Sequence, residues 1–211
     1  MSYSVKEVYY TLQGEGAHSG RPAVFVRFSG CNLWTGREND RSNAVCQFCD
    51  TDFVGINGPG GGKFRNPEAL ASHILTYWPR NTSVAPYVVF TGGEPMLQLD
   101  RPLIDALHER DVYIAIETNG TLSVPETVDW ICVSPKANAP WIQRTGNELK
   151  LVFPQHTLLP DMLGETSFSA YFLQPMDGPD VDAHTQEAIN YCKQNPRWHL
   201  SIQSHKVLRI P

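Results

Sequence analysis

Short β-rich runs separated by helical stretches are the feature that most constrains the fold of this chain. Strands that alternate with helices usually pair in parallel, so the pattern predicts an α/β domain on a largely parallel sheet. In such a sheet, functional groups gather beyond the carboxyl ends of the strands. The apolar and β-branched runs fall at residues 23–29, 87–91, 112–118, 130–134, 149–153, 169–174 and 199–202.

Three helices are expected between these runs. Asn66 as N-cap, followed by Pro67, announces a helix over residues 68–78. Two more are expected near residues 102–110 and 183–194. A chain of 211 residues is short for a closed eightfold barrel of about 250 residues. We therefore expect a partial, open parallel β/α barrel with fewer helices than a full barrel, formed by residues 1–211 as a single domain.

The balance of charges disfavours some partners. Charged residues make up 18% of the chain and the net charge is −5, which disfavours nucleic acid. The first ten residues lack a secretory signal, and no window approaches 18 consecutive apolar residues, so no membrane contact is expected. We expect a soluble, cytoplasmic protein. Five cysteines in such a chain favour metal or redox chemistry over disulfides.

Three of the cysteines crowd into the segment 31–49. Cys31 follows the first strand, and a spacer of fourteen residues separates it from Cys46, with Cys49 three positions later. Cys132 and Cys192 lie in an apolar strand and in a predicted helix, so both are expected to be buried. Three available thiolates suit a 4Fe-4S cluster in which one iron stays open to a bound cofactor.

A structural zinc site is the alternative reading of the same cysteines. Such a site ordinarily closes with four protein ligands. No histidine lies between Cys31 and Cys49, but Asp50 or Asp52 could supply the fourth ligand. A zinc-stabilised binding module without catalysis therefore stays as a second hypothesis.

Motifs along most of the chain resemble the 7-carboxy-7-deazaguanine synthases, a branch of the radical S-adenosylmethionine superfamily. That superfamily usually has a CxxxCxxC loop, whereas the first spacer here is residues 32–45. The motifs that carry the resemblance are LQGEG at 12–16, GCNLW at 30–34, QFCDTDF at 47–53, GGEP at 92–95, ETNG at 117–120, SPK at 134–136 and LQPMDG at 173–178.

The resemblance implies a carbon-nitrogen lyase in queuosine and 7-deazapurine biosynthesis. Members convert 6-carboxy-5,6,7,8-tetrahydropterin to 7-carboxy-7-deazaguanine with loss of ammonia, through a 5'-deoxyadenosyl radical that abstracts the C6 hydrogen. It further implies a radical S-adenosylmethionine core domain with a cluster loop at 31–49, a 4Fe-4S cluster, S-adenosylmethionine, Mg2+, an electron donor such as flavodoxin or ferredoxin, and a homodimer. Glycyl-radical activating enzymes are a rival in the same superfamily, but the LQGEG, ETNG and LQPMDG motifs favour a small-molecule substrate.

The resemblance also transfers roles to individual positions. Cys31, Cys46 and Cys49 would ligate the cluster, and Thr51 would bind Mg2+. S-adenosylmethionine contacts are implied for Phe48, Cys49, Asp50, Gly93, Ser134, Pro135, Lys136, Leu173, Gln174, Pro175 and Met176. Substrate contacts are implied for Leu12, Gln13, Gly14, Glu15, Arg27, Thr91, His205 and Pro211.

Some of these residues have a chemical rationale of their own. Arg27 could hold a substrate carboxylate through two charge-assisted bonds, or face outward from its strand. Gln13 and Glu15 could read the edge of a pterin ring, or lie in an exposed polar hairpin. The Thr51 hydroxyl suits a hard cation, although a turn threonine would look the same. GGEP could be an ordinary turn, and His205 could be a surface residue.

Overall fold

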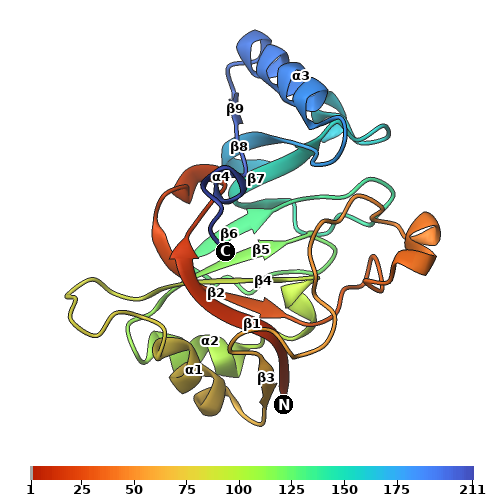
Figure 1. Cartoon of the computed structure of the whole chain (residues 1–211). Helices are drawn as coiled ribbons and strands as arrows, with labels where there is room; N and C mark the ends of the chain where they lie inside the picture. The colour runs from red at the N-terminus through yellow and green to blue at the C-terminus, as the bar shows by residue number, and fades with distance from the viewer. Residues whose placement is uncertain (1) are drawn as a thin grey trace.

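A nine-stranded sheet runs through the computed structural model, which describes residues 2–211. The strand order is β3-β1-β2-β4-β5-β6-β7-β8-β9, and the two outer strands do not pair with each other in the described chain, so the sheet is open (Figure 1). Neighbours from β2 to β9 are parallel. The strands are β1 (Tyr3–Leu12), β2 (Pro22–Phe28), β3 (Gly62–Phe64), β4 (Tyr87–Gly92), β5 (Tyr113–Thr118), β6 (Trp130–Val133), β7 (Thr145–Phe153), β8 (Ser167–Pro175) and β9 (Trp198–Leu200).

Helices α1 (Pro67–Leu75), α2 (Arg101–His108) and α3 (Val181–Gln194) are the three helices that the sequence predicts. A fourth, α4 (Ser204–Leu208), follows β9. The Asn66 side chain accepts a hydrogen bond from the Ala69 N–H at 2.8 Å, which confirms the expected N-cap. The open parallel sheet with few helices confirms the expected fold class.

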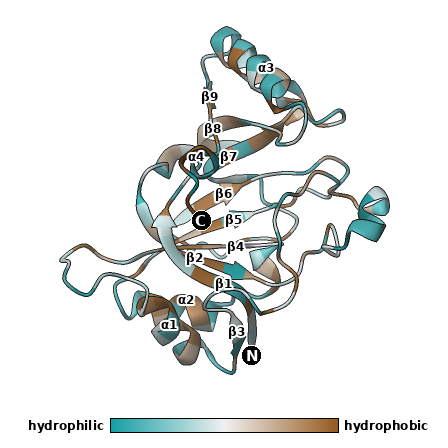
Figure 2. Cartoon of the chain, in the orientation of Figure 1, coloured by the Kyte–Doolittle hydropathy of each residue, from teal (hydrophilic) through white to brown (hydrophobic). Residues whose placement is uncertain are grey.

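The helices cover one face of the sheet. Ile114 and Ile116 of β5 pack in one apolar cluster with α1 and α2, and Leu149 and Leu151 of β7 pack in a second cluster with α3. Figure 2 shows hydrophobic colour along the central strands and on α1. Because successive strand residues face opposite sides, Lys150 between the two leucines faces the other side of the sheet. That side carries the polar groups described below.

Strand β1 is absent from the strands that the sequence predicts. It pairs with β2 and β3 in antiparallel fashion, and its register with β2 shifts between Val5 and Glu7. A bulge of this kind breaks the alternation by which a strand is identified. Lys6 lies at the bulge with 8% of its surface exposed, and its ammonium donates to the Val54 carbonyl at 2.9 Å.

The parallel strands bring distant motifs to one edge of the sheet. The segment with Cys31 follows β2, the GGEP turn with Gly93 follows β4, and the segment with Ser134 follows β6. All three strands end at the same edge because they run in the same direction. Among residues 2–211, no helix is both long and apolar enough to cross a lipid bilayer.

Candidate active site

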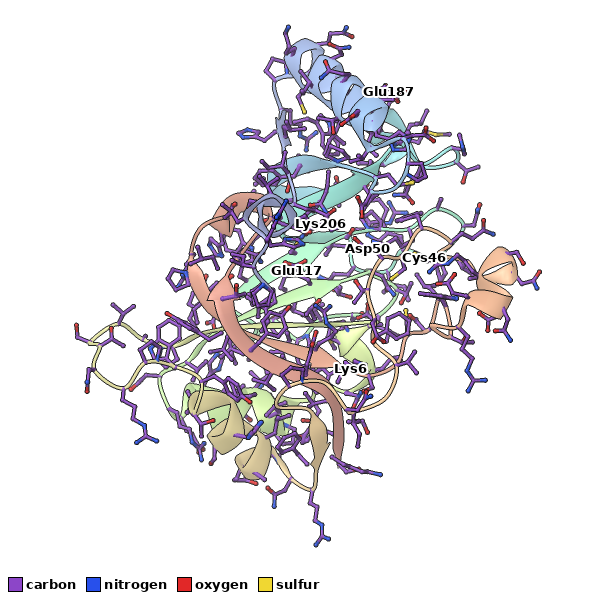
Figure 3. All side chains as sticks on the ribbon, in the orientation of Figure 1. Lys6, Cys46, Asp50, Glu117, Glu187 and Lys206 are labelled. Carbon is purple, nitrogen blue, oxygen red and sulfur yellow. The ribbon has the colours of Figure 1, made fainter. Side chains whose placement is uncertain are left out.

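A cavity of about 430 Å³ opens at this edge of the sheet. Cys31, Cys46 and Cys49 all line it, and all three are free thiols. Figure 3 shows Cys46 and Asp50 near the strand ends, in the same region as Glu117 and Lys206, while Glu187 lies away on α3. The structure thus brings the predicted cluster ligands to one wall.

The fourteen-residue spacer leaves this wall and returns to it. The Val45 and Cys46 N–H groups both donate to the Leu33 carbonyl, at 3.1 and 3.3 Å, so the two ends of the spacer lie together. Between them the chain forms a short 3-10 helix, η2 (Glu38–Asn43). The longer spacer therefore adds an excursion without separating the cysteines.

Arg41 of η2 fastens this excursion to the cysteine segment. Its Nη1 donates to the carbonyl oxygens of Gln47 and Cys49, both at 2.9 Å. Its guanidinium also lies over the Trp34 ring, 4.0 Å from the centroid. The backbone around Cys46 and Cys49 is thus held by a residue of the spacer.

The donor set fits a cluster with one open iron. Burial raises the pKa of Cys31 and of Cys46, and the nearby Cys49 thiol contributes to raising both. Asp52, a possible fourth zinc ligand, is exposed and pairs with Lys6 at 2.8 Å. Within residues 2–211, no three His, Cys, Asp or Glu side chains, the cysteines among them, form a group around a single ion. Three thiols on one wall are the number of protein ligands of a cubane that leaves one corner open.

The GGEP turn packs against residues 31–49, the cluster segment that contains the three cysteines. A Cβ atom added to Gly93 would lie 2.6 Å from the Cys31 Cβ, so only glycine fits there without a shift. Glu94 is fully buried and accepts hydrogen bonds from the Thr118 hydroxyl at 2.7 Å and the Asn119 N–H at 2.8 Å. Burial raises the pKa of this carboxyl. Glu94 therefore joins the GGEP turn to the ETNG segment.

The residues predicted to contact S-adenosylmethionine divide into two groups. Most line the cavity, and Lys136 donates to the Ser134 carbonyl at 2.6 Å. Leu173 is fully buried in the core between β8 and α3, because its neighbour Gln174 takes the cavity side of the same strand. Pro135 and Met176 also lie outside the lining. The predicted cofactor residues on the wall are Phe48, Cys49, Asp50, Gly93, Ser134, Lys136, Gln174 and Pro175.

All eight predicted substrate residues line the cavity, as does the predicted magnesium residue Thr51. Arg27 does not face away from the molecule. Its Nε donates to a Glu7 carboxylate oxygen at 2.8 Å and its Nη2 to the Tyr9 hydroxyl at 3.0 Å. The eight residues are Leu12, Gln13, Gly14, Glu15, Arg27, Thr91, His205 and Pro211.

Gln13 and Glu15 belong to a buried polar network. Gln13 Nε2 donates to Glu117 Oε1 at 2.8 Å. Lys150 Nζ donates to Glu15 Oε2 at 2.5 Å and to Glu117 Oε2 at 2.7 Å. The LQGEG turn is therefore not an exposed hairpin, because Gln13 contacts Glu117 of β5 and Glu15 contacts Lys150 of β7.

The C-terminal segment covers part of the cavity. The Ser204 N–H donates to the Gly14 carbonyl at 2.9 Å, which fixes α4 against the LQGEG turn. Lys206 Nζ pairs with Asp50 at 2.5 Å and with Asp177 at 2.6 Å. Thus α4 bridges the cluster segment and the end of β8. The Pro211 carbonyl accepts a hydrogen bond from the Thr11 hydroxyl at 3.1 Å.

Sequence reasoning missed several charged residues of the cavity wall. Lys150 carries a signal that could have found it, since it is the single charged residue in the apolar run LKLVF. Glu117 and Asp177 lie within the quoted motifs ETNG and LQPMDG but received no role. The others owe their place to contacts between distant segments, which no local pattern encodes. The missed charged residues are Lys6, Glu7, Glu117, Lys150, Asp177 and Lys206, and the amide of Gln203 was missed as well.

Comparison with known proteins agrees with this geometry. The 7-carboxy-7-deazaguanine synthase of Burkholderia multivorans is 58% identical, and that of Bordetella pertussis is 57% identical, each over the full length of both chains. The crystal structure of QueE from Escherichia coli matches with a TM-score of 0.72 at 27% identity, covering 97% of this chain and 95% of that one. No family model matches the sequence. On the full-length identities, the chain belongs to the 7-carboxy-7-deazaguanine synthase family.

Proposed function

We propose that this enzyme converts 6-carboxy-5,6,7,8-tetrahydropterin to 7-carboxy-7-deazaguanine with loss of ammonia. The observation that carries the proposal is that three free cysteines line the same cavity as Arg27 and Glu15. The cysteines suit a redox cluster, and Arg27 with Glu15 suits an anionic, nitrogen-rich ring. The names of the relatives supply the product.

Cys31, Cys46 and Cys49 would hold a 4Fe-4S cluster with one iron open to S-adenosylmethionine. When bound, this pair would supply the 5'-deoxyadenosyl radical chemistry needed to remove the C6 hydrogen of the substrate. The protein's own contribution is position. The closely packed GGEP turn and the segment with Ser134 and Lys136 would orient the cofactor, since small displacements of reacting groups cost large factors in rate.

Arg27 would bind the substrate carboxylate. A guanidinium has about five N–H groups, and two of those on Arg27 are already used on Glu7 and Tyr9. Those bonds fix the plane of the guanidinium and leave donors for a second carboxylate. Thr51, Thr91, His205 and Pro211 would complete the substrate and Mg2+ contacts, as the family resemblance implies.

Finer statements about the enzyme are part of the same proposal. The chain would act as one radical S-adenosylmethionine core domain, receive electrons from a flavodoxin or ferredoxin, and work as a homodimer in the cytoplasm. Size-exclusion chromatography with light scattering measures the oligomer. Reduction of the cluster by each candidate donor, followed by electron paramagnetic resonance, identifies the electron source.

Anaerobic reconstitution tests the central claim. The protein should be brown, contain iron and sulfide, and release 7-carboxy-7-deazaguanine when given reductant, S-adenosylmethionine, Mg2+ and the carboxytetrahydropterin. Cys49→Ala should lose both the cluster and turnover, while Cys192→Ala on α3 should keep both. Colourless protein with stoichiometric zinc would instead support a binding module. A cluster without any deazaguanine product would refute the substrate assignment alone.

A further inference from the structure

Lys150 is a buried cation on β7 that touches both carboxylates at the substrate end of the cavity. Its side chain is 4% exposed, and its ammonium pairs with Glu15 and Glu117 at 2.5 and 2.7 Å. Resting on the function proposed above, we infer that Lys150 is a positioning residue for the lyase reaction. It holds the side chains of Glu15 and Glu117 together as hydrogen-bond acceptors for the N–H groups of the substrate ring.

The hydrogen bonds of the two carboxylates leave room for a ligand. An ionised carboxylate has about four acceptor positions. Glu15 uses one for Lys150 and one for Gln203, whose Nε2 lies 3.0 Å from Glu15 Oε1. Glu117 uses one for Gln13 and one for Lys150. About two positions stay open on each carboxylate, and both residues line the cavity.

Lys150 favours the ionised form of the Glu15 carboxyl. Burial by itself raises the pKa of Glu15, but the Lys150 charge and the hydrogen bonds to Glu15 outweigh it, so the pKa of Glu15 is lowered. Burial works against the charged form of Lys150 as well, yet Glu117 and Glu15 raise the pKa of Lys150 well above its usual value. Without the ammonium, burial would act on Glu15 without its main opposing charge, and burial raises the pKa of this carboxyl.

No other cation replaces this contact. Within residues 2–211, Lys150 is the one Lys or Arg side chain that hydrogen-bonds to Glu15 or Glu117. Burial raises the pKa of Glu148, which lies on the same strand and accepts from the Ala17 N–H at 3.0 Å. The further titratable groups that face the three residues are His205 of α4, Cys132 of β6, Tyr9 of β1 and Tyr87 of β4.

Two substitutions separate charge from volume. Lys150→Met removes the ammonium at similar volume, and Lys150→Arg keeps the charge. Binding of the carboxytetrahydropterin is measured by calorimetry on reconstituted enzyme with S-adenosylmethionine but no reductant, from about pH 6.5 to about pH 9. Iron content, S-adenosylmethionine affinity and thermal unfolding are recorded for each variant, with Lys193→Met on the exposed side of α3 as control.

Lys150→Met should weaken pterin binding by about tenfold or more near neutral pH, because a protonated carboxyl loses an acceptor. Part of the loss should return near pH 9 as Glu15 ionises, whereas Lys150→Arg should bind within about threefold of wild type at every pH. Iron content and S-adenosylmethionine affinity should stay unchanged. Wild-type affinity in Lys150→Met, or a loss equal at every pH that arginine does not restore, would overturn the inference.

Wild-type protein provides a second measurement if Lys150→Met does not fold. With Glu15 already ionised, the heat of pterin binding near pH 8 should not depend on the ionisation enthalpy of the buffer. Uptake of about one proton per bound pterin would overturn the inference. A wild-type enzyme that binds no pterin would overturn the proposed function along with it, whereas wild-type binding with an unaffected variant refutes only the role of Lys150.

Discussion

Replacing Gly93 with alanine tests how closely the GGEP turn packs on the cluster segment. The added Cβ would lie 2.6 Å from the Cys31 Cβ and 2.7 Å from the Gly30 carbonyl carbon. Carbon atoms pack comfortably at about 3.5–4.0 Å, so one segment must move by about 1 Å. Neither is free to move, because the Gly30 carbonyl accepts from the Glu94 N–H and the Gly30 N–H donates to the Phe53 carbonyl.

Such overpacking should lower the free energy of unfolding by about 1–3 kcal/mol. A displacement of about 1 Å between cluster and cofactor should also reduce turnover by one to two orders of magnitude, roughly as misplaced catalytic groups do. Urea unfolding and single-turnover product formation measure the two effects. Gly62→Ala is the matched control, since its Cβ would meet no atom nearer than Phe64 Cε2 at 3.7 Å. Wild-type stability and turnover in Gly93→Ala would refute the close packing.

Three further predictions concern charged residues. Arg41→Ala should release iron to a chelator about twofold to tenfold faster than wild type, because two carbonyls of the cluster segment lose a donor; Arg101→Ala should match wild type. Lys206→Met removes the two ion pairs that hold α4 over the cavity and should raise the KM for the pterin by about threefold to tenfold, whereas Lys193→Met should leave the KM unchanged. An unchanged KM in Lys206→Met would show that these ion pairs do not hold α4 in place. The pKa of Glu15 is lowered because its ammonium partner outweighs burial, so wild-type stability should fall as pH drops through that lowered value, and urea unfolding of Glu15→Gln should show a smaller loss.

Periodicity and caps predicted much of the fold. Seven strands and three helices follow from apolar runs, the Asn66 cap and strand-helix alternation. Strand β1 was missed because a bulge at Lys6 disrupts its alternation, and β3 was missed because it has only three residues. Helix α4 has only five residues, too few for a helical period to appear in the sequence.

The site was predictable where a local motif follows the carboxyl end of a parallel strand. Such strands deliver Cys31, Gly93 and Ser134 to one edge whatever lies between them. Within the LQPMDG motif, Leu173 and Gln174 face opposite sides of the strand, so only the Gln174 side chain reaches the cavity. The Lys150 contacts join β7 to β5 and to the LQGEG turn, so only the folded chain reveals them.

The neck formed by Val45, Cys46 and the Leu33 carbonyl has a consequence for how members of this family are recognised. Because these hydrogen bonds hold the two ends of the loop together, the number of residues between Leu33 and Val45 can vary without moving the cysteines. Lengthening such a loop costs little chain entropy. Counting residues between the first two cysteines is therefore a poor signature. Genomic searches that let this interval float, while fixing the C-x-x-C pair and a downstream GGEP, should recover members that a rigid pattern discards.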